Sequence, residues 1–135
     1  MSGSISRSDL SAMIRSAQEK LASARYLLTG GFFSDVSSRS YYAVFHMLTA
    51  LLATKGLCYS SHAQVLGAFN REFLHSAAVQ GISFDQIQQL FAHRQRGDYG
   101  TPLDLTRESA SQDIELAEQI LDRCAAYLRD MNLLD

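Results

Sequence analysis

The 135-residue sequence has two cysteines, one proline, no tryptophan and only 19% charged residues. Cys58 and Cys124 are too few for a disulfide scaffold, and their spacing matches no zinc pattern. No uncharged run of 18 residues occurs, so no membrane-spanning helix is expected. Residues 1–9 carry Arg7 and Asp9 without an apolar stretch, which is unlike a signal peptide. We therefore expect a cytoplasmic protein with reduced thiols and no membrane contact.

The charge balance is slightly acidic, with a net charge of −2 and a pI of about 6.0. A strongly basic nucleic-acid footprint is therefore absent from the chain as a whole, and any RNA or DNA contact requires a local patch. The apolar fraction of 47% is enough for a core. The length predicts a single domain over 1–135, with residues 1–7 disordered. The low charged content predicts that part of the surface is buried against a second subunit.

Apolar residues recur at spacings of three, four and seven, and no segment alternates with period two. Gly30 and Gly31 end the first periodic segment, and Ser61 with Gln64 fits a capping box at the third. The connections between segments are short. The pattern predicts an all-α fold, an up-and-down bundle of four to five antiparallel helices. The expected helices cover 8–29, 34–55, 61–74, 84–98 and 106–132. Ser8 or Asp9 is the expected N-cap of the first, and Ser34 and Asp35 are the candidates for the second.

The segment 34–55 is apolar on nearly all sides, which is typical of a buried central helix. Arg39, Tyr42 and His46 share one face of it, because residues three, four and seven apart are neighbours on a helix. An arginine that clamps a phosphate and a histidine that moves a proton are a minimal set for metal-independent RNA cleavage. The alternative is a buried polar network in which Arg39 pairs with an acid such as Asp35.

A second polar cluster, HRQRGDY at 93–99, lies at a predicted helix end. Its cations suggest an anionic ligand in a protein that is acidic overall. The alternative is an ordinary solvated helix end, with Arg94 and Asp98 forming an i,i+4 pair. The acids of the last predicted helix look like a solvated face; they are Asp113, Glu115, Glu118 and Asp122.

We expect no metal and no cofactor. His62 and His75 have no cysteine, histidine or acid at ligand spacing. The sequence also contains no glycine-rich phosphate loop, no nucleophile elbow and no paired-carboxylate signature.

Two stretches carry a family resemblance: SSRSYYAVFH at 37–46, within a longer match to 57, and RQRGDYG at 94–100. Their order and spacing resemble the HEPN domain (higher eukaryotes and prokaryotes nucleotide-binding), in particular small stand-alone bacterial and archaeal members. The resemblance spans about 10–130. It implies a four- or five-helix bundle, a homodimer, and pairing with a minimal nucleotidyltransferase in a toxin–antitoxin operon.

Many HEPN relatives are metal-independent ribonucleases with an arginine, four to six residues and a histidine, followed in the toxin branch by a tyrosine. Here Arg94 precedes Asp98 and Tyr99, so an aspartate stands where that branch has its histidine. An aspartate is a poorer proton shuttle at pH 7 unless its pKa is raised. In some relatives the neighbouring tyrosine is modified with AMP, which makes Tyr99 the residue to suspect here.

Three functions remain open at this stage. The first is a module that binds a nucleotide or RNA phosphate and works with a nucleotidyltransferase. Its ligand-contacting residues would be Arg39, Tyr42, Arg94, Arg96 and Tyr99. The second is a ribonuclease toxin, with His46 or Asp98 as proton shuttle and Arg39 or Arg94 as phosphate clamp. The third is a helical scaffold whose polar residues only fix register.

Overall fold

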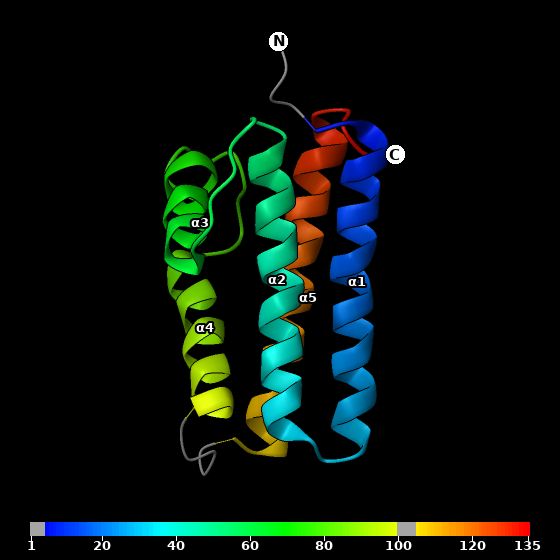
Figure 1. The fold of residues 1–135 in the computed structure, drawn as a ribbon, viewed down its shortest axis with the longest axis vertical. Helices are drawn as coiled ribbons and strands as arrows, with labels where there is room; N and C mark the ends of the chain where they lie inside the picture. Colours follow the sequence, from blue (N-terminus) through cyan, green and yellow to red (C-terminus); the bar gives the residue numbers. More distant parts are fainter. Residues whose placement is uncertain (1–4, 100–104) are drawn as a thin grey trace.

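The computed structural model describes residues 5–99 and 105–135, and within them it contains helices and no strand (Figure 1). The predicted all-α bundle is confirmed. Residues 5–7, which we expected to be disordered, belong to the described part. The elements are α1 (Arg7–Thr29), α2 (Phe33–Ala53), α3 (His62–Phe69), a π-helical turn η1 (Asn70–Leu74), α4 (Phe84–Tyr99) and α5 (Arg107–Asp130).

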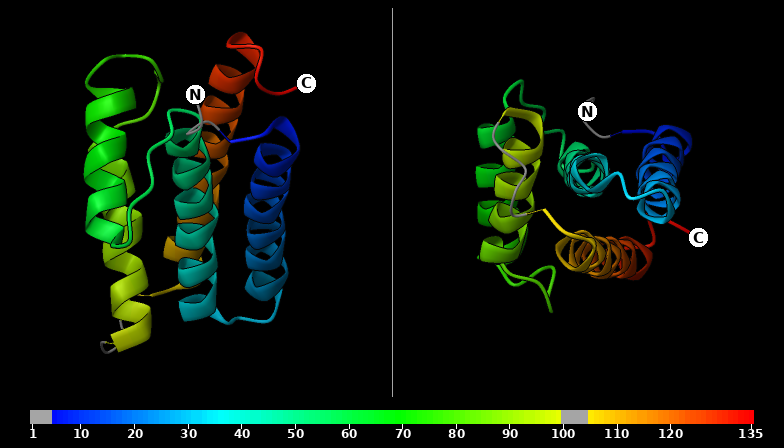
Figure 2. Two further views of the ribbon diagram at one scale, coloured as in Figure 1. Left: turned by 45° about the horizontal axis from the view of Figure 1, so that its top comes forward. Right: turned by 90° about the horizontal axis from the view of Figure 1, so that it is seen from below.

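Helix α2 is the centre of the bundle and contacts α1, α3, α4 and α5. Figure 1 shows α1 on one side of α2, α3 and α4 on the other, and α5 behind. The view from below in Figure 2 has the same arrangement, with α2 end-on between α1 and α4. Helix α3 lies beside the C-terminal half of α2, and α4 lies beside its N-terminal half. One long helix therefore positions side chains from every other element.

The sequence of α2 explains this central place, because most of its residues are apolar or small and are buried. They are Val36, Ser37, Ser40, Tyr41, Ala43, Val44, Met47, Leu48, Ala50, Leu51 and Leu52. One strip of α2 stays open to solvent between α1 and the α3–α4 side. It contains exposed Arg39 and half-buried Tyr42, Phe45, His46 and Thr49. The strip is where α2 presents polar and aromatic groups to solvent.

Local signals set most of the helix ends. The predicted capping box at Ser61 and Gln64 is present, and Ser83 with Gln86 forms a second reciprocal pair. Gly56 has a φ of +72° just after α2, the left-handed conformation that favours glycine.

Two predicted N-caps are wrong. Helix α1 is capped by Ser6, whose hydroxyl accepts from the Asp9 N–H, and not by Ser8 or Asp9 itself. Helix α2 begins at Phe33 without a side-chain cap, although Ser34 and Asp35 were the expected candidates. The glycine turn before Phe33 brings the chain into the helix one residue earlier, so Ser34 already lies inside the first turn.

Truncation of a leucine in α2 tests its central role. We expect Leu48→Ala to lower the free energy of unfolding by about 2–5 kcal/mol, because Leu48 is fully buried and would leave a cavity. Urea denaturation followed by circular dichroism measures this loss. Leu116→Ala in α5 is the matched control, since Leu116 is only half-buried and should lose clearly less. Equal losses at both positions would contradict the central place of α2.

Candidate phosphate-binding site

The two polar clusters of the sequence meet where α4 packs on α2. An Nη atom of Arg94 donates to the Tyr42 hydroxyl at 2.8 Å, across 52 residues of chain. The guanidinium carbon lies 5.3 Å from the centroid of the Tyr42 ring and 5.9 Å from that of Tyr41. Both distances are within the range of a cation–π interaction. Arg94 is therefore held as a positive charge against the tyrosine pair of α2.

Aromatic rings continue from this pair toward the start of α3. The buried Tyr41 hydroxyl lies 2.7 Å from Nδ1 of His62. The His62 ring stacks on Phe45, with centroids 4.2 Å apart. Phe91 of α4 also packs on Tyr41, with centroids 5.4 Å apart. Half-buried Tyr42, Phe45 and His62 thus form an aromatic surface beside the Arg94 charge.

The charge of Arg94 and the burial of this cluster perturb its titratable groups. Burial lowers the pKa of His62, and the nearby Arg94 guanidinium lowers it further. Burial raises the pKa of the Tyr41 hydroxyl, against the opposing effect of Arg94. At neutral pH these rings are neutral, and Arg94 supplies the positive charge of the cluster.

Arg39 and His46 flank Tyr42 on α2 but do not contact Arg94 in the described part of the chain. Arg39 is exposed, and within residues 5–99 and 105–135 it forms no ion pair, so the alternative pairing with Asp35 is not present. Burial lowers the pKa of His46, and the second cause is Lys20 of α1. His46 therefore faces the α1 side of the strip. Of the three predicted α2 residues, Tyr42 is the one with a contact to the described part of the α4 cluster, residues 93–96.

The remaining predicted residues lie at the C-terminal end of α4. Arg96 is exposed two residues after Arg94. The side chains of Asp98 and Tyr99 lie outside the described residues, as do residues 100–104. The suggested pair of Arg94 with Asp98, and the roles assigned to Asp98 and Tyr99, stay predictions.

Sequence reasoning missed a buried polar triad beside Arg94. Asp113 of α5 is 0% exposed, and its carboxylate accepts from the Ser37 hydroxyl at 2.9 Å. Nδ1 of His93 lies 2.8 Å from one carboxylate oxygen and 3.0 Å from the other. Burial raises the pKa of Asp113, while His93 and the Ser37 hydrogen bond act against this rise. The triad connects α2, α4 and α5 next to the tyrosine–arginine contact.

The prediction that the acids of the last helix form a solvated face is therefore wrong for Asp113. The position of Asp113 in the sequence indicated its burial, because it lies three residues after Ala110 and four before Ala117 on the apolar stripe of α5. An acid on that stripe is buried when the helix packs, and a buried carboxylate needs donors. His62 offered no such signal, since its place depends on the path of the loop before α3.

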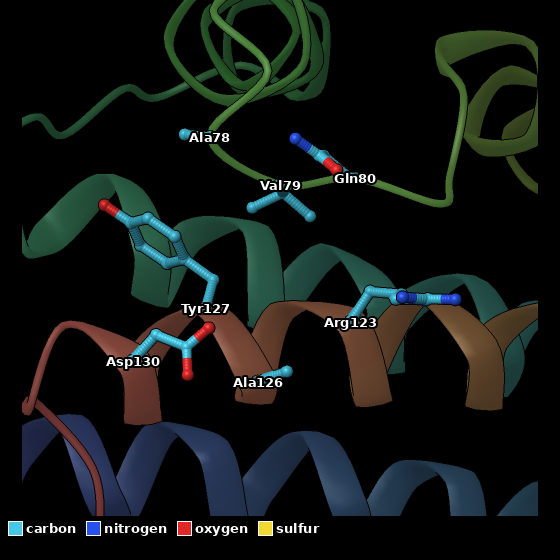
Figure 3. Close-up of a pocket in the computed structure, with 7 residues that line it drawn as sticks. All are labelled: Ala78, Val79, Gln80, Arg123, Ala126, Tyr127 and Asp130. Atoms are coloured by element: carbon cyan, nitrogen blue, oxygen red, sulfur yellow. The ribbon is translucent and has the colours of Figure 1, made fainter.

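No group of three or more histidine, cysteine or acidic side chains able to hold a metal occurs among the described residues. A cavity of about 320 Å³ lies between the segment 78–80 and the C-terminal half of α5 (Figure 3). Figure 3 shows Arg123, Tyr127 and Asp130 around it, none of which belongs to the α2–α4 cluster. The described helices include none that is long and apolar enough to cross a membrane.

Known proteins resemble this chain over most of its length. The model of the HEPN domain family matches residues 10–127, which include α2, α4 and nearly all of α5. The chain belongs to the HEPN domain family. A UPF0332 protein of Thermotoga maritima is 37% identical over 87% of this chain and 89% of its own length. A Methanocaldococcus jannaschii protein named "Putative toxin MJ0605" is 33% identical over 93% of this chain and 92% of its own.

The position of Arg94 has a consequence for the titration of His62. We expect Arg94→Gln to raise the pKa of His62, because the substitution removes a nearby positive charge that lowers it. An NMR titration of the imidazole resonances measures this change. His46 is an internal control, since its pKa is lowered by burial and by Lys20, so its titration should stay unchanged. An unaltered His62, or equal shifts of both histidines, would contradict the described contact.

Proposed function

We propose that this HEPN domain binds the phosphate of RNA or of a nucleotide through Arg94 and acts as the toxin-like member of a toxin–antitoxin pair. The observation that carries the proposal is the Arg94 guanidinium held against Tyr42, on the strip of α2 that stays open to solvent. The toxin name of the archaeal relative supports the same role.

The chemistry of the cluster suits a phosphate attached to a base. A planar guanidinium matches two phosphate oxygens and keeps its charge at all physiological pH values. Exposed Arg39 of α2 and exposed Arg96 of α4 add positive charge to the two helices that carry the site. The half-buried rings of Tyr42, Phe45 and His62 offer faces on which a nucleobase can stack. The ligand class is thus a phosphate with an adjacent base.

The proposal includes two protein partners. A second copy of the chain would cover part of the open surface, in keeping with the low charged content of 19%. The other partner is a minimal nucleotidyltransferase, for which family membership is the support. Co-expression of the tagged chain with the small nucleotidyltransferase of the same genome tests this pairing. Co-purification of the nucleotidyltransferase with the tagged chain supports the pairing. A nucleotidyltransferase that washes off at physiological salt contradicts it.

Metal-independent RNA cleavage is the second candidate function. The observation that favours it is the histidine fixed beside the phosphate-binding arginine, since His93 and Arg94 are consecutive in α4. Two residues were expected from the sequence for proton transfer. His46 has no described contact with Arg94, and the side chain of Asp98 lies outside the described residues.

RNA binding tests the first proposal directly. The probe is a fluorescein-labelled, 2′-O-methylated single-stranded RNA that cannot be cleaved, followed by fluorescence anisotropy. We expect Arg94→Ala to weaken binding by about 10- to 100-fold, as the loss of a charge-assisted hydrogen bond predicts. A plot of log affinity against log salt concentration should be less steep for Arg94→Ala than for the wild type, by about 0.7 for each lost phosphate contact.

Arg15→Ala is the matched control, because Arg15 is an exposed arginine on α1 outside the cluster. The affinity of Arg15→Ala for the labelled RNA should stay within about twofold of the wild-type affinity. If the wild-type chain does not bind the RNA, or if both variants weaken binding equally, the assignment of the site to Arg94 is wrong.

A further inference from the structure

We propose that the cavity between the segment 78–80 and the C-terminal half of α5 binds a short peptide with free ends, about three residues long (Figure 3). The site lies outside the α2–α4 cluster, so the proposal does not depend on phosphate binding at Arg94. Its ligand differs as well, because the cavity presents a cation at one end, Arg123, and an acid at the other, Asp130.

The cavity is large enough for a small organic molecule. Its volume of about 320 Å³ lies at the lower end of the range for ligand pockets. The buried side chain of Val79 points toward α5, where Ala126 leaves room because its side chain ends at Cβ. The half-buried Tyr127 ring borders the cavity and packs edge-on against Phe73, with centroids 5.4 Å apart. The middle of the cavity therefore offers apolar contacts to a ligand.

The backbone beside the cavity has an unusual conformation and is held in place. Ala77 follows the π-helical turn η1 with a φ of +62°, a left-handed conformation that a non-glycine residue seldom adopts. The N–H of Val79 donates to the Phe73 carbonyl at 2.9 Å. The side chain of Gln119 in α5 donates to the Gly81 carbonyl at 3.1 Å. π-Helical turns and left-handed residues of this kind are frequent at functional sites.

Arg123 supplies a positive charge at one end of the cavity. Its guanidinium packs against Gly81, where a Cβ would lie 2.6 Å from Nε. Gly81 has a φ of +87°, so the close approach and the backbone conformation both favour glycine here. Within residues 5–99 and 105–135, the Arg123 side chain forms no ion pair and no hydrogen bond. An unpaired guanidinium that is held on one side can bind a carboxylate through two hydrogen bonds.

Asp130 supplies a negative charge at the other end. It is the last residue of α5, where the helix dipole adds partial negative charge. Its carboxylate has no ion pair or hydrogen bond in the part of the chain that the structure describes. The neighbouring Arg129 donates to a backbone oxygen of Asp135 and lines a different cavity, between α1 and α5. The end of α5 therefore favours an ammonium group.

The two charges determine the length of the ligand. Arg123 and Asp130 are seven residues apart, so they share one face of α5 and are separated by about 10 Å along its axis. An extended chain spans about 3.4 Å per residue, so three residues reach from one charge to the other. The peptide carboxylate would bind Arg123 and the amino group would bind Asp130. The Tyr127 hydroxyl, which has no hydrogen-bond partner among the described residues, is available to a peptide group between them.

Other classes of ligand fit the cavity less well. The phosphates of a nucleotide or of RNA carry only negative charge, and Asp130 would repel them. A divalent cation needs several acidic ligands, and no group of three suitable side chains occurs in the described residues. The charges of a simple amino acid are too close together to reach both ends of the cavity.

The competing explanation is that the cavity holds only water and that Arg123 and Asp130 are ordinary solvated side chains. Blocked peptides separate the two explanations, because each lacks one charge of the ligand. Tri-alanine carries both charges, tri-alanine amide lacks the carboxylate, and N-acetyl-tri-alanine lacks the ammonium group.

The experiment titrates each peptide into the ¹⁵N-labelled full chain and follows the amide resonances by NMR. We expect tri-alanine to shift the resonances of 78–81 and 123–130 to saturation, with a Kd of about 0.1–1 mM. The two blocked peptides should each bind about 5- to 20-fold more weakly, as the loss of a charge-assisted hydrogen bond predicts.

Substitutions assign the two ends of the site. In Arg123→Gln, tri-alanine and its amide should bind equally weakly, because the group that distinguishes them is gone. The same should hold in Asp130→Asn for tri-alanine and its acetylated form. Ala126→Leu should abolish binding by filling the cavity, and circular dichroism checks that this substitution of an exposed residue leaves the fold intact. Arg15→Gln and Asp122→Asn, exposed residues outside the cavity, are the matched controls and should bind like the wild type.

The proposal is overturned if tri-alanine causes no saturable shifts in 78–81 and α5, or if all three peptides bind with equal affinity. Binding that persists unchanged in Ala126→Leu would also overturn it. Neither result bears on the RNA binding assigned to Arg94.

Discussion

The contact between Arg94 and Tyr42 is the interaction on which the site depends. It joins α4 to the open strip of α2 and keeps a guanidinium against two tyrosine rings. A long cationic side chain loses conformational freedom when it is held this way, and the hydrogen bond and the ring faces compensate for that loss. The result is a charge in a fixed position at the surface of an acidic chain, which is what recognition of a phosphate requires.

The buried carboxylate of Asp113 is the second constraint, and it fixes the helices that carry the first. An ionised carboxylate without partners is costly inside a protein, so the positions of Ser37 and His93 are coupled to it. Because these three residues come from α2, α4 and α5, the triad sets how α4 lies across α2. The burial of Asp113 and the position of Arg94 thus depend on the same packing of α4 against α2 and α5.

The sequence predicted the helices well because their signals are local. The apolar spacing located the elements, and the Ser61–Gln64 capping box marked the start of α3 within one residue. The sequence also selected Tyr42 and Arg94, since polar groups are unusual on a central helix and cations gather at a helix end. Their contact was not local, because it depends on where α4 packs 52 residues later.

The residues Asp113, Arg39 and His46 show what local reasoning leaves out. Asp113 was assigned to solvent because acids usually are, although its spacing from Ala110 and Ala117 placed it on the apolar stripe. Arg39 and His46 were candidates because they share one face of α2, and their roles stay predictions, since spacing on one helix does not show what packs opposite. The α1 side of the strip faces His46, and the α4 side carries the arginine.

The most direct test of this account is an NMR map of the RNA-binding surface. A short 2′-O-methylated RNA is titrated into the ¹⁵N-labelled chain, and amide shift changes are assigned along the sequence. The account predicts that the largest changes fall on the open strip of α2 around Tyr42 and on the last two turns of α4. Changes that gather instead around the cavity formed by 78–80 and α5, with Tyr42 and Arg94 unaffected, would contradict it.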